Sequence, residues 1–418
     1  MKRTTPPAWT LSAGLLLLAG FAAPRADDLA SLSDPVKATI ASEAEQAALR
    51  APPAPQLPLG QARLDPATGR WVASYGDRRA VLTLEPRLQA ALERSLEQWT
   101  VPWGVTVLIE PATGRVLAMA EHSQREPDRR GMALQPMAPA ASIFKLVTAA
   151  ALLEQGVSPG EQVCYHGGRH RLQPRLLDDD PRRDRSCVTL ESAFGHSTNV
   201  VFAKLAGRGL DASLLRSAAE RFMFNSEIPF AEQVGVSPAR IEDDRFELAN
   251  TAAGFGPVRL SPLHGALLAA TVANGGLFVP PVLIDHVEGA PTPTPLAPWR
   301  VVDEQVAASL QDMMRATVTE GTGRRQFKRA GGSLRGVTVA GKTGSLSEQG
   351  PYRDYSWFVG FAPADKPEIA IATVVVNERL WRVRATRVAR EALEAYFRTQ
   401  VAQAGDEAGP RTAHAARP

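Results

Sequence analysis

Residues 105–121, VTVLIEPATGRVLAMAE, carry the clearest structural signal in the chain. Two apolar runs, 105–110 and 116–121, flank the pentapeptide PATGR, whose proline and glycine favour a tight reversal of the backbone. This pattern predicts a β-hairpin. The same pentapeptide occurs at 66–70, again between apolar runs, and predicts a second hairpin there.

Helical and strand patterns follow the hairpin in a clear order. Apolar residues at helical spacing predict helices at 142–155, 189–206, 211–223, 261–274, 303–319 and 381–400. Runs of strand-forming residues predict strands at 337–343, 356–362 and 368–376. Strands at both ends with helices between them predict an α+β fold, in which an antiparallel sheet is flanked by helices and carries an inserted helical lobe.

Composition and charge narrow the class of protein. The chain has 418 residues, of which 44% are hydrophobic and 22% charged, as is typical of globular proteins. The net charge is only +3, from 47 basic and 44 acidic residues, and no dense basic block occurs. Nucleic acid is therefore not an expected partner.

The N-terminal residues have the pattern of an export signal. Lys2 and Arg3 precede the apolar stretch 8–23, and small residues follow it. We expect 1–26 to be a signal peptide. An uncleaved anchor stays open as an alternative, because Pro24 and Arg25 blur the cleavage site. The sequence thus predicts an exported protein in the periplasm or on the outer face of the cytoplasmic membrane.

The rest of the chain divides into three predicted segments. Residues 27–80 are predicted to be a linker with a short N-terminal segment, because 51–60 is rich in proline. The dense patterns between 81 and 400 predict the main domain. Residues 401–418, rich in alanine, glycine, arginine and proline towards their end, are predicted to be a disordered tail.

The chain contains two cysteines, Cys164 and Cys187, in a polar stretch. In an oxidising compartment the natural prediction is a disulfide that closes this loop. Two alternatives stay open: a zinc site made by both cysteines with His166 and His170, and a pair of unpaired thiols.

Three short motifs carry residues suited to acyl-transfer chemistry: SIFK at 142–145, STN at 197–199 and KTGS at 342–345. In the first, Ser142 and Lys145 share a helix face. A serine hydroxyl becomes a good nucleophile when a neighbouring base takes its proton. Lysine can act as that base if burial or a second cation lowers its pKa, whereas arginine cannot. Only seven of the 47 basic residues are lysines, and two of them lie in these motifs.

The other two motifs would complete such a site. Ser197 can relay a proton to a leaving group, and the Asn199 carboxamide can both donate and accept a hydrogen bond. In the third motif, Lys342 offers a compact positive charge for a terminal carboxylate, which the hydroxyls of Thr343 and Ser345 can also bind. Gly344 has no side chain, so we expect a substrate backbone to lie along this strand.

The three motifs in this order resemble those of the penicillin-binding proteins and the related serine β-lactamases. The similarity extends to LTLEPRLQAALE (82–93), VLIEPATGRVLAMA (107–120), GFGPVRLSPLHGALLAATVANGG (254–276) and WFVGFAP (357–363). It covers residues 81–395 and is specific to transpeptidase domains. The resemblance implies a β-lactamase/transpeptidase-like fold for the predicted α+β domain.

The resemblance also implies a role for each motif residue. Ser142 would be the acylated nucleophile, Lys145 its general base and Ser197 the proton relay. Asn199 would hold the substrate peptide, and Lys342 and Thr343 its carboxylate. The backbone N–H groups of Ser142 and Ser345 would form the oxyanion hole. No metal or other cofactor is implied.

The implied substrates are peptidoglycan stem peptides that end in D-Ala-D-Ala, with β-lactams as inhibitors and proteins of cell-wall synthesis as partners in a complex. The leading hypothesis is a D,D-transpeptidase. A D,D-carboxypeptidase differs from it only in passing the acyl group to water. A β-lactamase is disfavoured because no Glu-x-x-Leu-Asn segment follows Ser197. A catalytically silent relative that binds wall peptides or senses β-lactams is the remaining alternative.

Overall fold

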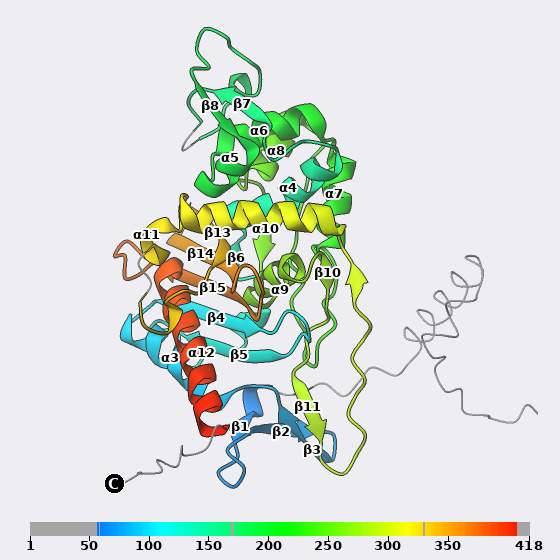
Figure 1. Cartoon of the computed structure of the whole chain (residues 1–418), viewed down its shortest axis with the longest axis vertical. Helices are drawn as coiled ribbons and strands as arrows, with labels where there is room; N and C mark the ends of the chain where they lie inside the picture. Colours follow the sequence, from blue (N-terminus) through cyan, green and yellow to red (C-terminus); the bar gives the residue numbers. More distant parts are fainter. Residues whose placement is uncertain (1–56, 58, 169–170, 329–330, 408–418) are drawn as a thin grey trace, which may run out of the picture. The chain divides into compact units, whose positions relative to one another are not determined.

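A five-stranded antiparallel sheet, in the order β13-β14-β15-β4-β5, forms the centre of the fold (Figure 1). Its strands are β4 (Trp103–Ile109), β5 (Val116–His122), β13 (Ala340–Gln349), β14 (Tyr352–Ala362) and β15 (Ile369–Asn377). This computed structural model describes residues 57, 59–168, 171–328 and 331–407. The described residues from 57 onward belong to one compact unit, whereas the predicted signal or anchor at 1–26 lies outside the described residues.

Helices cover both faces of this sheet (Figure 1). Helix α9 (Pro262–Ala273), buried along its whole length, packs on one face, and α3 (Pro86–Gln98) and α12 (Ala385–Glu407) pack on the other. Every residue of β15 is therefore buried. This explains why its sequence, IAIATVVVN, is almost continuously apolar instead of alternating. The predicted α+β class, with an antiparallel sheet flanked by helices, is confirmed.

Both predicted hairpins are present. The PATGR turns join β1 (Arg63–Leu64) to β2 (Trp71–Tyr75) and β4 to β5. Gly114 adopts φ +72, and a Cβ at this position would lie 2.2 Å from the Pro280 carbonyl oxygen. Glycine is therefore needed in the second turn both for its backbone conformation and for close packing.

The predicted boundary between linker and main domain at residue 81 does not coincide with a break between structural elements. Strand β3 (Arg78–Leu82) runs across it, and β1, β2, β3 and β11 (Ile284–Val287) form a four-stranded sheet. Pairing of β3 with β11 joins residues about two hundred positions apart, in the register Leu82↔Ile284. A local pattern cannot reveal such a contact, so this segment looked peripheral in the sequence.

The inserted lobe is helical, as predicted. Its helices are α4 (Lys145–Glu154), α5 (Leu190–His196), α6 (Asn199–Gly209), α7 (Ala212–Arg221) and α8 (Arg245–Ala252), and α10 (Glu304–Thr319) lies between the lobe and the sheet (Figure 1). Side chains cap several of these helices: Asp211 Oδ1 accepts from Leu214 N, and Asp303 Oδ1 from Val306 N.

Two helix predictions in the lobe need correction. The single helix expected at 189–206 is two helices, because Ser197 adopts the left-handed conformation, with φ 56, and ends α5. Helix α8 was not predicted, since its eight residues show little amphipathic pattern. Both errors fall beside motif residues, where tertiary packing overrides local preference.

Short elements complete the described chain: β6 (Ala138–Pro139), β7 (Gln162–Tyr165), β8 (Ser186–Thr189), β9 (Arg259–Leu260), β10 (Leu277–Phe278), β12 (Trp299–Arg300) and α11 (Arg324–Phe327). Helix α12 continues to Glu407, past residue 401 where a disordered tail was expected to begin. Residues 408–418 lie outside the described residues.

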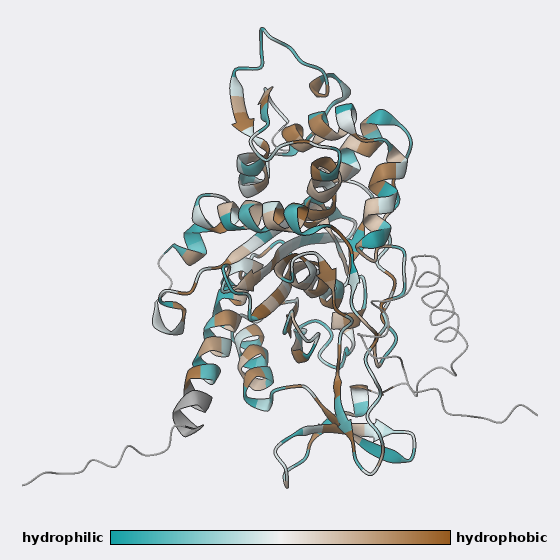
Figure 2. Ribbon diagram, turned by 45° about the vertical axis from the view of Figure 1, so that its right-hand side comes forward, coloured by the Kyte–Doolittle hydropathy of each residue, from teal (hydrophilic) through white to brown (hydrophobic). Residues whose placement is uncertain are grey.

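Hydrophobic residues gather inside the folded unit. Figure 2 shows them along the central strands, whereas the segment between β7 and β8 is mostly hydrophilic. Among the described helices, none combines the length and the apolar character that crossing a membrane requires. The buried hydrophobic residues form two clusters, which lie between the central sheet and the helices packed on its two faces.

Candidate active site

Ser142 lies in a tight turn that leads into α4. This 3₁₀ turn spans Ala141–Phe144, so the helix expected from residue 142 begins with a narrower first turn. Ala141 holds a positive φ of 49, which is uncommon for a residue with a side chain. Strain of this kind, directly before a candidate nucleophile, is characteristic of functional sites. The Ser142 side chain is half-buried beside this turn.

Lys145 sits one helical turn beyond Ser142 and is fully buried. Its Nζ lies 2.9 Å from Ser142 Oγ, so the structure brings these two groups into hydrogen-bond contact. Nζ also donates to Asn199 Oδ1, at 2.8 Å, and to the backbone oxygen of Ala253. Three neutral oxygens thus surround this amine, and it makes no ion pair with a carboxylate of the described residues.

The electrostatic surroundings favour the neutral form of Lys145. Burial, and secondly the positive charge of Lys342, hold the pKa of Lys145 well below its usual value. Burial also lowers the pKa of Lys342, to about 7. A neutral amine 2.9 Å from a serine hydroxyl is able to accept its proton.

The second motif occupies the break between α5 and α6. Ser197 ends α5, and its backbone N–H bonds to the Phe194 oxygen at 3.1 Å. Asn199 is the first residue of α6, which directs its side chain to Lys145. The break at Ser197 therefore allows α6 to begin at Asn199, whose side chain accepts a hydrogen bond from Lys145.

The third motif lies on β13, at the edge of the central sheet. Lys342 is fully buried, with Nζ 3.0 Å from the backbone oxygen of Thr343 and 5.3 Å from the ring centre of Phe194. Thr343 is half-buried and Ser345 is exposed. Within the described part of the sheet, β13 pairs only with β14, which leaves its other edge for a ligand.

The structure adds a second reason for glycine at position 344. A Cβ at this position would lie 3.2 Å from Ile143 Cγ1 and 3.4 Å from the Ala140 oxygen. Glycine therefore allows β13 to pack closely against the segment that carries Ser142, which is a role in building the site. The predicted role of Gly344 in admitting a substrate backbone stays a prediction.

The sequence did not reveal that the end of α8 helps to hold this site. The oxygens of Ala252 and Ala253 accept hydrogen bonds from Thr148 Oγ1 and Lys145 Nζ. Gly254, with φ +92, packs so closely that a Cβ would lie 2.5 Å from the Ala141 oxygen. The only available signal was the Gly254-Phe255-Gly256 sequence within the segment that resembles the family.

Thr322 was also missed. Its Oγ1 lies 2.6 Å from Thr343 Oγ1, and its backbone N–H bonds to the Gly195 oxygen at 3.0 Å. It therefore connects β13 to the end of α5 just before Ser197. The sequence EGTG at 320–323 indicates a turn, but nothing in it indicates the partners.

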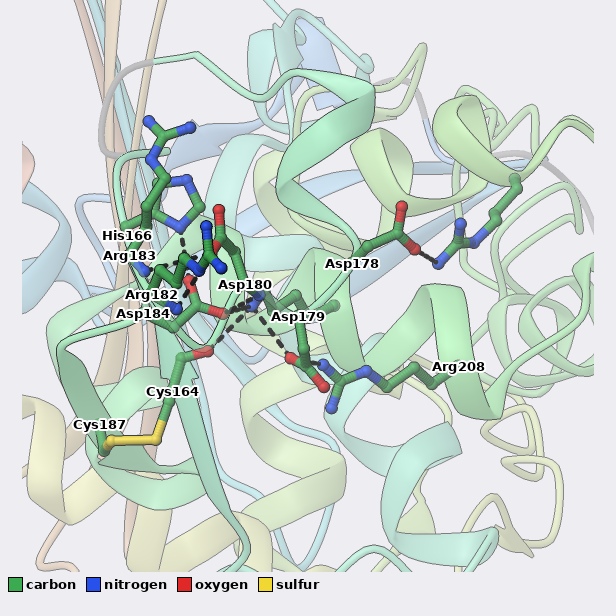
Figure 3. A network of polar contacts seen from close by, with 12 residues as sticks. Cys164, His166, Asp178, Asp179, Asp180, Arg182, Arg183, Asp184, Cys187 and Arg208 are labelled. Atoms are coloured by element: carbon green, nitrogen blue, oxygen red, sulfur yellow. Dashed lines mark hydrogen bonds and ion pairs between the residues drawn. A yellow bond between two sulfur atoms is a disulfide. The ribbon is translucent and has the colours of Figure 1, made fainter.

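The disulfide predicted between Cys164 and Cys187 is present and joins facing positions of β7 and β8 (Figure 3). Because both sulfurs are bonded to each other, neither is a thiolate ligand, and the zinc alternative is wrong. His170, its fourth proposed ligand, lies outside the described residues. Across the described residues, no cluster of three or more His, Cys, Asp or Glu side chains fits a metal ion.

A polar network surrounds this hairpin (Figure 3). The buried Lys204 Nζ donates to the Cys164 oxygen, at 3.0 Å, and forms ion pairs with Asp179 and Asp184. His166 Nδ1 also contacts Asp184. Burial acts to raise the pKa of Asp184, but the hydrogen bonds from His166 and Lys204 outweigh it and hold this pKa below its ordinary value.

A serine at the start of a helix, a buried lysine beside it and a second lysine on an adjacent edge strand define the class of serine acyl-transfer sites in which lysine is the base. The family model for the penicillin binding protein transpeptidase domain matches residues 104–395. The chain belongs to the penicillin-binding protein transpeptidase family.

Individual relatives agree with this assignment. The peptidoglycan D,D-transpeptidase PbpA of Mycobacterium tuberculosis is 30% identical over 337 residues, which cover 71% of this chain and 66% of PbpA. FtsI of Escherichia coli, also named a peptidoglycan D,D-transpeptidase, is 25% identical over 326 residues, 73% of this chain and 53% of FtsI. The chain thus spans about two thirds of the one relative and about half of the other.

The fold matches solved structures as well. Penicillin-binding protein A from M. tuberculosis, solved as an imipenem acyl-enzyme complex, superposes with a TM-score of 0.61 and 28% identity, covering 75% of this chain and 79% of that one. The structure of Pseudomonas aeruginosa PBP2 gives a TM-score of 0.62 with 26% identity and 81% coverage of each chain. The β-lactamase/transpeptidase-like fold predicted from the sequence is confirmed.

Proposed function

We propose that this chain is a peptidoglycan D,D-transpeptidase that acts through an acyl-enzyme on Ser142 and binds penicillin. The observation that carries the proposal is the 2.9 Å contact between Ser142 Oγ and a buried Lys145 whose pKa is lowered by burial and by Lys342. Relatives named D,D-transpeptidases, and a relative solved as an acyl-enzyme complex, support it.

In the proposed acylation, Ser142 Oγ attacks the carbonyl carbon of the penultimate D-Ala while Lys145 Nζ takes the hydroxyl proton. The backbone N–H groups of Ser142 and Ser345 stabilise the oxyanion. The bond to the terminal D-Ala then breaks, and Ser197 relays the proton to the departing amine. Asn199 holds the peptide, and Lys342 and Thr343 hold the terminal carboxylate.

In the second half-reaction, the amine of another stem peptide attacks the ester on Ser142. A new amide bond forms, the serine oxygen leaves, and the amine's proton returns through Lys145 to Ser142 Oγ. Water in place of the amine would release the free acid, which is the carboxypeptidase alternative. Proteins of cell-wall synthesis are proposed as partners in a complex.

We also propose that the protein works outside the cytoplasm, in the periplasm or on the outer face of the cytoplasmic membrane. The disulfide between Cys164 and Cys187 supports this, because such bonds persist in oxidising compartments. Fractionation of cells that express the full chain tests the proposal, and recovery of all the protein from the cytoplasm would contradict it.

The decisive experiment on activity follows the intact mass of the full chain after brief exposure to a penicillin, beside Ser142→Ala. A long-lived adduct on the wild type alone is the expected result. An adduct that is lost within seconds while antibiotic is consumed would point to a β-lactamase, and no adduct would point to a silent relative. Product analysis with a D-Ala-D-Ala peptide, with and without an amine acceptor, then separates transpeptidase from carboxypeptidase.

A further inference from the structure

A basic hollow lies where α10 ends. It has a volume of about 460 Å³ and is lined by Glu320, Gly321, Arg324, Arg325 and Lys328. The two arginines belong to the short helix α11, and Figure 1 shows α11 at the end of α10. None of these five residues belongs to the three motifs.

The hollow carries an excess of positive charge. Its three cations are exposed and make no ion pair with a carboxylate of the described residues, whereas Arg315, earlier on α10, pairs with Asp312 at 3.0 Å. Glu320 is the only acid among the lining residues. Guanidinium groups without a protein carboxylate are well suited to bind an anion, and their planar fork matches a carboxylate.

One lining residue of the hollow, Gly321, packs against a segment of the candidate active site. A Cβ on Gly321 would lie 2.0 Å from the Gly195 oxygen, so glycine is needed for the turn after α10 to meet the end of α5 here. The next residue, Thr322, bonds to the same oxygen and lies 2.6 Å from Thr343 Oγ1. An anion in the hollow would therefore lie beside the strand that is proposed to hold the terminal carboxylate.

We propose that the basic hollow binds a second carboxylate of the peptide substrate, carried by an acidic residue and distinct from the C-terminal carboxylate. This inference rests on the proposed function, which places the C-terminal carboxylate at Lys342 and Thr343. A peptide held there at its end and by a second carboxylate in the hollow is fixed at two points, which favours substrates with an acidic residue over neutral ones.

The test uses two D-Ala-D-Ala peptides that differ only in whether the side-chain carboxylate of one acidic residue is free or amidated. Each is titrated calorimetrically against the full chain carrying Ser142→Ala, so that binding is measured without turnover. The free form is expected to bind about tenfold more tightly, as a few partly exposed charge-assisted hydrogen bonds would provide. Adding Arg324→Gln, Arg325→Gln and Lys328→Gln should abolish this difference.

A matched control removes three positive charges elsewhere. Arg87, Arg94 and Arg398 are exposed, lie on α3 and α12, and make no ion pair with a described carboxylate, so their Gln variants should keep the preference for the free form. Equal binding of the two peptides by the Ser142→Ala protein with its hollow intact would overturn the inference. The inference would also be overturned if the hollow variant and the control variant lost the preference for the free form to the same extent. Penicillin acylation of both triple variants with Ser142 restored should match the wild type, and it reports on the proposed function separately.

Discussion

Two regions of this molecule bury lysines in opposite surroundings. In the candidate active site, Lys145 and Lys342 are fully buried and make no ion pair with a described carboxylate. Each instead lies near an aromatic ring, of Phe202 at 5.5 Å and of Phe194 at 5.3 Å. In the lobe, Lys204 is equally buried but forms ion pairs with Asp179 and Asp184.

The difference separates a lysine that stabilises structure from lysines prepared for chemistry. A carboxylate beside a buried ammonium keeps it charged, whereas burial without one favours loss of the proton. The charge of Lys342 is the second cause of the lowered pKa of Lys145, whereas burial alone lowers the pKa of Lys342. Burial by itself therefore does not distinguish these lysines, whereas the presence or absence of a counter-ion does.

The largest expected effect comes from the same substitution at the two kinds of lysine. Lys145→Arg should slow penicillin acylation of Ser142 by roughly a thousandfold, because a guanidinium cannot act as the base. Lys204→Arg keeps the charge that Asp184 requires and should acylate at the wild-type rate. The measurement is the rate of adduct formation by mass spectrometry. Acylation by Lys145→Arg at a near wild-type rate would remove Lys145 from the proposed mechanism.

Substitution by methionine should have the larger effect at Lys204 and the smaller at Lys145 when stability, and not acylation, is measured. Lys204→Met strips the buried Asp184 of its cation and should reduce the free energy of unfolding by about 3 kcal/mol. Lys145→Met leaves no buried carboxylate without its partner and should cost clearly less. Denaturant unfolding of both variants provides the comparison.

Asp184→Asn, added to Lys204→Met, should recover part of the lost stability, since the amide needs no counter-ion. An equal loss for the two methionine variants would show that the ion pairs of Lys204 contribute no more than the neutral contacts of Lys145.

The smallest expected effect is on the pH dependence of peptide binding, and it tests whether a buried lysine without a carboxylate partner loses its charge near neutral pH. Because the pKa of Lys342 is about 7, its ammonium form declines as the pH rises above that value. Binding of a D-Ala-D-Ala peptide to the Ser142→Ala protein should therefore weaken by roughly fivefold from about pH 7 to about pH 8. The same peptide with its C-terminus amidated should show no such change. Equal pH dependence for both peptides would argue against Lys342 as the carboxylate-binding group.

Stability should respond to pH in the direction set by the same group. Between about pH 7 and the ordinary lysine pKa of about 10.4, the unfolded chain binds a proton that folded Lys342 does not. The contribution of this group to the free energy of unfolding thus increases as the pH rises through that window. Below about pH 7, where Lys342 is charged in both states, burial of its ammonium group reduces the free energy of unfolding by the full amount. Lys342→Met should remove this reduction.

Patterns that are local in the chain predicted much of the fold. The 105–121 hairpin, α9 and α10 follow from turn residues and from apolar spacing, which depend only on neighbours in sequence. The break at Ser197 and helix α8 were missed because packing around the site, and not local preference, sets their backbone. Strand β3 was missed because its partner β11 lies far along the chain.

The sequence by itself determined the type of chemistry. A serine three residues before a lysine, in a chain with only seven lysines, and two further motifs in order were sufficient to propose a nucleophile, a base and a carboxylate-binding cation. These inferences hold because side-chain type and helical spacing are properties of the sequence.

Only the tertiary structure decided which lysines are buried, and beside what. It placed Ala253 and Asn199 around Lys145, carboxylates around Lys204, and Thr322 between β13 and α5. The physical reason is that a pKa depends on exclusion of solvent and on nearby charges, both of which are set by the fold. The separation of two residues along the chain does not give their distance in space.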